Sequence, residues 1–172
     1  MNQKNEMILA IDAGTQSIRA ALVDVKGNIR HIVKTPIVPY FSENPGWAEQ
    51  DPDYYWKMLC QSCREAIRQA AKAKERIAAV TLTTQRATMI NVDADGKPLR
   101  PAIIWLDQRK ADSHGIIPDV ARPVLKAVGL HGTVDEAVRN CEANWIRQHQ
   151  PEIWKKTHKY LLLSGFFTHR LT

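Results

Sequence analysis

A long amphipathic helix predicted at residues 53–74 constrains the fold of this chain more than any other sequence feature. Asp51 can cap a helix and Pro52 suits the first helical position, so the helix is predicted to begin there. Apolar side chains then recur every three or four positions, and lysines and arginines take the opposite face. A helix of about twenty residues can carry the chain across a sheet to a parallel strand. The flanking segments should therefore supply the strands of an α/β domain.

Strand patterns lie on both sides of this helix. Residues 8–12 form a short apolar run that predicts a buried strand, and residues 17–25 and 29–38 predict two more strands joined by a turn. Residues 77–83, which follow the helix, predict another buried strand. We expect the first three strands to be antiparallel neighbours and residues 77–83 to lie parallel to residues 8–12 after a right-handed crossover. This order predicts an α/β fold with a mixed sheet and flanking helices.

Shorter strands and then helices are predicted in the second half of the chain. The strand candidates are residues 89–92 and 103–106, with a turn-rich segment at residues 93–98 between them. Helical patterns are predicted in four segments: residues 111–117, 123–128, 133–149, and 152 to the end with breaks. Thr133 and Glu136 have the spacing of a capping box for the third helix. A chain of 172 residues can form one substantial core, so we expect one domain.

Charge, hydropathy and cysteine content exclude several classes of protein. The net charge is +6, but basic residues are scattered among acidic ones, so we expect no nucleic-acid partner. No apolar stretch is long enough to span a membrane, and residues 1–7 are not followed by the apolar segment of a signal peptide. We therefore expect no membrane partner and a cytoplasmic location. The cysteines are odd in number, which disfavours a disulfide framework. Cys60 and Cys63 form a C-x-x-C inside the predicted helix, which favours buried thiols over a redox pair or a zinc site.

The segment from Asp12 to Arg19 contains the first candidate site. Asp12 ends the first predicted strand, and a turn of small and polar residues follows. Glycine in such a turn lets the backbone approach an anion, polar side chains offer donors, and arginine can neutralise phosphate charge. These roles fall to Gly14, Thr15, Gln16, Ser17 and Arg19, while Asp12 could hold Mg²⁺ directly or through water. The alternative is that an Asp-x-Gly segment between strands forms only a turn.

Three further motifs occur in a set order along the chain. They are Pro45-Gly46-Trp47 followed by Glu49-x-Asp51-Pro52, then Thr84-Gln85-Arg86, then Ile104-Trp105-Leu106-Asp107-Gln108-Arg109. In order and spacing they resemble the N-terminal domain of the FGGY carbohydrate kinases, which include glycerol kinases, xylulokinases and gluconokinases. The resemblance extends over residues 8–172.

This resemblance implies an RNase H-like fold of the actin, Hsp70 and sugar kinase superfamily, in which two domains close on ATP and a sugar. It implies ATP and Mg²⁺ as cofactors, with Asp12 near Mg²⁺ and the turn from Gly14 to Ser17, together with Arg19, facing the ATP phosphates. Gln85 and Arg86 would lie in the sugar site, where Arg86 donates to hydroxyls. Trp105 would present a flat face to the sugar, and Asp107 would accept hydroxyl protons. The alternatives are that Trp105 is a core residue and that Asp107 and Arg109 form a surface pair.

Departures from the family pattern bear on the acceptor. Glycerol-kinase-like members have a Glu after the Gln-Arg pair, whereas this chain has Ala87, and residues 135–138 lack the Tyr of that subgroup. Xylulokinase-like members have Met-His where this chain has Arg86-Ala87. These differences argue against both glycerol and xylulose and leave a longer sugar or a sugar acid. Glu142 also stands where the family tends to carry Lys, three residues before Trp145.

The resemblance also predicts what residues 1–172 do not contain. The general-base Asp is expected beyond Thr172, so we expect a truncated chain that holds the N-terminal domain without the C-terminal ATPase-type domain and is inactive alone. The full-length protein would phosphorylate a sugar, polyol or sugar acid with ATP. The oligomeric state is not predicted, and a homo-oligomer is one possibility. The alternatives are a non-catalytic ATP- or sugar-binding module, such as a degenerate kinase, and an actin-like structural subunit.

Overall fold

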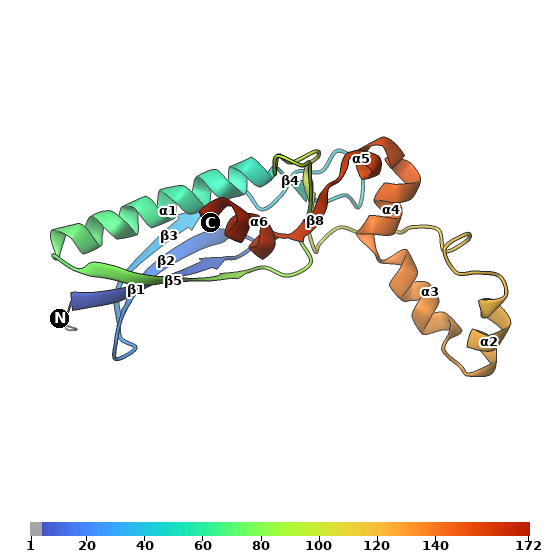
Figure 1. Ribbon diagram of the computed structural model, residues 1–172, viewed down its shortest axis with the longest axis horizontal. Coiled ribbons are helices and arrows are strands. Elements are labelled where there is room, and N and C mark those ends of the chain that lie inside the picture. The colour runs from blue at the N-terminus through green and yellow to red at the C-terminus, as the bar shows by residue number, and fades with distance from the viewer. Residues whose placement is uncertain (1–4) are drawn as a thin grey trace.

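The chain forms two four-stranded sheets and a set of helices that extend from the second sheet, as seen in a computed structural model that describes residues 5–172 (Figure 1). Most of the N-terminal segment considered for a signal peptide, residues 1–4, lies outside the described residues. The first sheet, sheet A, has the strand order β3-β2-β1-β5, and the second, sheet B, has the order β4-β7-β6-β8. No helix in residues 5–172 combines the length and apolar character that a membrane crossing requires.

Sheet A confirms the topology predicted for the first half. Its strands are β1 (Glu6–Ala13), β2 (Ser17–Asp24), β3 (Ile29–Pro36) and β5 (Arg76–Thr84). β2 pairs antiparallel with β1 and with β3, whereas β5 pairs parallel with β1. Because a parallel pair needs a crossover, helix α1 (Pro52–Lys72) connects the two parts of the sheet. The mixed sheet and its crossover helix are as expected.

Helix α1 begins where the sequence predicts and packs along one face of sheet A (Figure 1). The Asp51 carboxylate accepts a hydrogen bond from the Asp53 backbone N–H at 2.9 Å, which satisfies one of the donors left free at a helix start. The main core lies between this helix and the sheet, and its fully buried members include Ile18, Leu22, Tyr55 and Leu59. Cys60 and Cys63 are unpaired, half-buried thiols of α1, and burial raises the pKa of Cys63 to about 11.

The prediction that residues 77–83 form a buried strand is wrong in one respect. β5 is a strand, but most of its residues are exposed, and 54% of Val80 is accessible to solvent. β5 lies at the edge of sheet A, and α1 packs mainly against β2 and β3 on the other side of the sheet. An apolar run therefore predicted the strand correctly, but its burial depends on what covers the edge.

Sheet B is built from segments far apart in the sequence. It contains β4 (Glu49–Gln50), β7 (Ala102–Ile103), β6 (Met89–Val92) and β8 (Lys159–Leu162), all paired antiparallel. β6 was predicted, β4 and β8 were not, and β7 ends earlier than the predicted residues 103–106. It ends early because the chain turns at Trp105, where the Asp107 N–H donates to the Ile104 carbonyl at 2.9 Å. Helix α6 (Leu163–Leu171) follows β8 directly and buries Phe166 and Phe167 in the main core.

The remaining helices form an arm that projects from sheet B (Figure 1). They are α2 (Ala121–Ala127), α3 (His131–Arg139), α4 (Glu142–His149) and α5 (Pro151–Lys156). The single helix predicted for residues 133–149 is wrong, because Cys141 is extended and starts a new helix. The predicted capping box is also wrong, since α3 begins at His131 and Thr133 lies inside it.

Residues 111–117, predicted as helical, form a turn with an isolated bridge between His114 and Ile117. The Asp112 carboxylate accepts from the His114 N–H at 2.9 Å, a local bond that competes with helix formation.

Candidate functional site

Asp12 lies at the carboxyl end of β1, beside Arg19 on β2 and, one strand further, Lys34 on β3. One oxygen of the Asp12 carboxylate accepts from Arg19 at 2.7 Å, and both side chains are a little over 40% exposed. A carboxylate with one free oxygen at an open strand end suits Mg²⁺, which is usually held by one or two carboxylates, waters and substrate phosphates. No group of three or more His, Cys, Asp or Glu ligands occurs within residues 5–172. The position and exposure of Asp12 are compatible with the predicted role of a magnesium ligand, which stays a prediction.

The turn after Asp12 is closed by its own backbone. The Gly14 N–H donates to the Ser17 carbonyl, and the Gln16 carbonyl accepts from the Ile37 N–H, both at 3.0 Å. Ser17 is buried, so it holds the shape of the turn, while the Gln16 and Arg19 side chains are accessible. The five predicted phosphate-binding residues line one open cavity of about 680 Å³ with Lys34, Tyr40 and Trp105. A cavity with two cationic side chains and one turn is suited to an anionic ligand.

A chain of hydrogen bonds joins this turn to the predicted acceptor residues. The Trp105 Nε1–H donates to the Thr15 hydroxyl oxygen at 3.0 Å, and the Thr15 hydroxyl donates to Gln85 Oε1 at 2.8 Å. Gln85 Nε2 then donates to the Tyr55 hydroxyl oxygen at 2.9 Å. Burial raises the pKa of Tyr55 to about 12, although the bond from Gln85 acts in the opposite direction. Three segments predicted to carry the site therefore meet at the ends of β1 and β5, over the start of α1.

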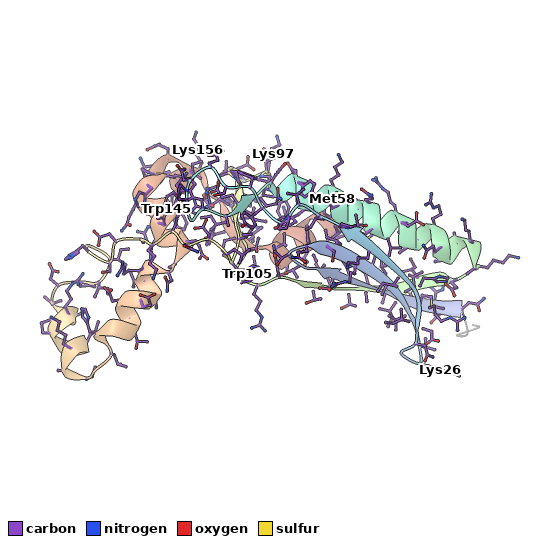
Figure 2. All side chains as sticks on the ribbon, turned by 180° about the vertical axis from the view of Figure 1, so that it is seen from behind. Lys26, Met58, Lys97, Trp105, Trp145 and Lys156 are labelled. Carbon is purple, nitrogen blue, oxygen red and sulfur yellow. The ribbon has the colours of Figure 1, made fainter. Side chains whose placement is uncertain are left out.

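Trp105 is accessible, with 52% of its surface exposed, and it lies where sheet A meets the rest of the chain (Figure 2). The alternative that Trp105 is a core residue is therefore wrong. Arg86 is the second residue after β5 and is exposed, and it lines a cavity of about 360 Å³ with Gln85. Trp105 does not line this cavity but lines two others. The structure therefore joins Gln85 to Trp105 through hydrogen bonds, but it does not bring Arg86 to Trp105. The role of Arg86 stays a prediction.

Asp107 is enclosed: only 3% of its side chain is exposed. One oxygen accepts from the Ala48 N–H at 2.7 Å, and both oxygens accept from Arg109 at 2.7 to 2.9 Å. The alternative of a surface pair is therefore wrong, because Asp107 and Arg109 form a buried ion pair. All these bonds fix the loop after Trp105, so the carboxylate holds the indole in place rather than presenting a free oxygen.

Arg109 is the centre of a buried group that we call the Arg109 cluster: Trp47, Glu49, Arg100, Asp107, Arg109 and Trp145. Its guanidinium donates to Glu49 at 2.9 Å and lies 4.2 Å from the ring centre of Trp47 and 4.6 Å from that of Trp145. Arg100 donates to the same oxygen of Glu49. Burial acts to lower the pKa of Arg109, but its bonds to Asp107 and Glu49 outweigh this and raise it, whereas burial lowers the pKa of Arg100. Trp145 lies on α4 (Figure 2). The cluster therefore connects three parts of the chain, which are the segment at Trp47, helix α4 and the loop that carries Trp105.

Sequence reasoning missed Lys34, Tyr55 and the burial of Glu49. Lys34 could have been found from the register of the predicted hairpin, because it is the cross-strand partner of Arg19. Tyr55 was assigned to the apolar stripe of the helix, and only its hydroxyl contact with Gln85 shows its place beside the site. Glu49 was quoted within a motif, but nothing local indicates that it pairs with two arginines more than fifty residues away.

Comparison with known proteins identifies the family. Residues 7–172 match the model of the N-terminal domain of the FGGY family of carbohydrate kinases. A xylulose kinase from Staphylococcus epidermidis is 29% identical over 97% of this chain and 33% of its own length, and a glycerol kinase from Parabacteroides distasonis is 39% identical over 96% and 33%. The chain thus spans about a third of the length of these relatives.

A solved structure has the same fold. The glycerol kinase of Plasmodium falciparum, determined with ADP, superposes with a TM-score of 0.74 at 26% identity, over 97% of this chain and 34% of that one. Its superfamily is the one with the actin- and Hsp70-like α/β fold, as predicted. From its motifs, its fold and its match over residues 7–172, this chain belongs to the FGGY family of carbohydrate kinases.

Proposed function

We propose that the full-length protein transfers the γ-phosphoryl group of ATP to a hydroxyl group of a sugar, polyol or sugar acid. The observation that carries the proposal is the hydrogen-bond chain from Trp105 through Thr15 to Gln85, because it links the turn proposed to bind phosphate with residues proposed to bind the acceptor. A phosphoryl transferase needs its two substrates held in line, and catalysis of this kind is mostly positioning and charge stabilisation. Membership of the FGGY family supports the same reaction.

On the nucleotide side, the cavity beside the turn supplies positive charge for phosphate oxygens. Arg19 and Lys34 line it from neighbouring strands, and Gln16 offers an accessible amide. Asp12 would hold Mg²⁺, which when bound neutralises charge on the β- and γ-phosphates. The bond between Arg19 and Asp12 keeps the carboxylate oriented at the strand end.

On the acceptor side, Trp105 offers its exposed face to the C–H surface of the acceptor, and Arg86 is free to donate to its hydroxyls. Asp107 acts through the loop, since its oxygens are already hydrogen-bonded. The group that removes the hydroxyl proton is proposed to be an Asp beyond Thr172, in the part of the protein that the relatives have and residues 1–172 lack. A cytoplasmic location and self-association remain predictions.

The proposal is tested by ADP release from full-length protein with saturating ATP and Mg²⁺. A panel of glycerol, xylitol, D-xylulose, D-glucose and D-gluconate should reveal turnover with at least one acceptor, and residues 1–172 alone should show none. Folded full-length protein that turns over none of these and related pentoses, hexoses, polyols and acids would instead support a non-catalytic binding module.

A further inference from the structure

A second cavity adjoins Trp105, and none of its lining residues belongs to the turn from Gly14 to Ser17. Its volume is about 530 Å³, and its lining includes Trp105 and Ala87 together with Lys110, Asn140 and Glu142. This volume lies within the range of small-molecule sites. Ala87 contributes only a methyl group, so the charged atoms around the cavity come from the loop after Trp105 and from the start of α4. Because Trp105 lines both cavities, a molecule in this one lies next to the site described above.

Glu142 is the carboxylate of this cavity that other residues leave free. Its half-buried side chain makes no hydrogen bond or ion pair with another residue in the described range 5–172. Burial raises the pKa of Glu142; its own backbone N–H acts against this, Asp107 adds to it, and Arg109 lowers it. The same lining carries two cations, and both are already paired. Arg109 is bonded to Asp107 and Glu49, and Lys110 is paired with Glu136 on α3 at 2.8 Å. A half-buried carboxylate without a partner is costly unless something else supplies donors.

We propose that Glu142 is a specificity-determining residue that accepts hydrogen bonds from hydroxyl groups of a neutral acceptor and disfavours acceptors that carry a carboxylate. The inference rests on the proposed kinase function and narrows its acceptor class to neutral sugars and polyols. The cavity has room for a polyhydroxylated chain where Ala87 leaves space, and Glu142 supplies there the acceptor oxygens that Ala87 cannot. Two like charges enclosed in one cavity repel each other, so a sugar acid placed against Glu142 is penalised.

A purely structural role for Glu142 would have a different signature. Asp107 and Arg109 are the charged groups of the protein that influence its pKa, and one nitrogen of Arg109, Nη1, is buried without a hydrogen-bond partner within residues 5–172. If Glu142 served only to balance Arg109, its replacement would lower stability and affect all acceptors alike. The ratio of specificity constants for an acid and a neutral acceptor separates the two roles.

The test uses full-length enzyme and the variants Glu142→Gln, Glu142→Lys and Glu152→Gln. Glu152 is the matched control, because it lies in the first turn of the neighbouring helix α5 and its exposed carboxylate pairs with Lys155 outside the cavity. kcat/KM is measured for D-gluconate and for xylitol, D-xylulose and glycerol. Binding of the same compounds without ATP is followed by tryptophan fluorescence.

Glu142→Gln should lower kcat/KM for the best neutral acceptor by about tenfold or more, with an unchanged KM for ATP. Glu142→Lys should raise the ratio of kcat/KM for gluconate to kcat/KM for the neutral acceptor by about tenfold or more. Glu152→Gln should give the same ratio as wild type. Turnover with ratios that stay within about twofold in both Glu142 variants would overturn the inference and leave the kinase function standing.

The fluorescence measurement tests the role of Glu142 even if the kinase function is wrong. Absence of turnover in wild type, with neutral-sugar binding that weakens in Glu142→Gln, would refute the kinase function and support the role of Glu142. Absence of both turnover and binding in wild type would overturn both.

Discussion

Glu49 offers the sharpest test of how the Arg109 cluster holds the chain together. Its carboxylate accepts from both Arg100 and Arg109, and the three side chains are each only 4 to 5% exposed. Glu49→Gln keeps the shape but removes the negative charge and leaves the guanidinium groups facing a neutral amide. Breaking a buried pair on one side costs about 3–5 kcal/mol, because the remaining charge is uncompensated. At roughly 2–4 °C per kcal/mol for a chain of this size, Tm should fall by about 6–20 °C.

The assay is thermal unfolding for Tm and urea unfolding for the free energy, both followed by tryptophan fluorescence, since Trp47 and Trp145 contact Arg109 directly. Glu65→Gln is the control, because Glu65 pairs with Arg68 on the exposed face of α1 and should cost less than about 1 kcal/mol. Adding Arg100→Met to Glu49→Gln removes one unpaired charge and should restore part of the free energy of unfolding that Glu49→Gln loses. A Glu49→Gln variant as stable as the Glu65→Gln control would refute the reasoning that these charges depend on each other.

Four further predictions concern single residues. Asp12→Asn in full-length enzyme should lower kcat by about 10²-fold while KM for the acceptor changes little, since its proposed role is to hold the Mg²⁺ that stabilises charge on the transferred phosphoryl group. A steady-state kcat within a few-fold of wild type would show that Asp12 is only a turn residue. Arg86→Ala should lower kcat/KM for the accepted sugar by about ten- to a hundredfold, and an unchanged value would exclude Arg86 from the acceptor site. Lys74 has a φ of 54° just after α1, so Lys74→Gly should raise the free energy of unfolding by about 1 kcal/mol, whereas Lys57→Gly at an exposed position inside the helix should lower it by a similar amount; equal effects in urea unfolding would contradict this. Burial raises the pKa of Glu142 above its usual 4.5, so the folded chain binds that proton more tightly than the unfolded chain, and this contribution to stability is lost as pH rises above 4.5. Glu142→Gln should therefore gain stability relative to wild type as pH rises above 4.5, and a difference that does not change with pH would contradict it.

Local patterns predicted sheet A well because its signals are local. Asp51 and Pro52 mark the start of α1 through bonds within one helical turn, and the turn near Gly27 sets the hairpin between β2 and β3. The exposure of Val80 depends on which strand ends the sheet and what covers it, which no pattern within β5 records. Likewise β8 exists because Leu162 pairs with Met89, and a four-residue segment followed at once by a helix gives little periodicity of its own.

The candidate site divides in the same way. The chemistry of the residues around Asp12 allowed either a phosphate turn or a plain turn between strands, and the structure places the turn residues on one cavity. The contact between Trp105 and Thr15, ninety residues apart, was not predicted, because the family resemblance placed Thr15 at the phosphates and Trp105 in the sugar site without joining them. The enclosure of Asp107 follows from Ala48 and Arg109, one of them fifty-nine residues distant, so an exposed acidic ligand and a buried loop anchor were indistinguishable in the sequence.

The two sheets differ in when they can form during synthesis. Sheet A is complete once residue 84 has left the ribosome, because its four strands and α1 all lie within that length. Sheet B pairs β4 at residue 49 with β7 at residue 103, and β6 with β8 at residue 162, so its closure waits for nearly the whole chain. Contacts of long sequence separation form slowly, and domains assemble in the order in which their segments emerge. Until β8 arrives, the edge of β6 that β8 will cover has no partner strand, so a nascent chain exposes this edge until residue 162 has been made.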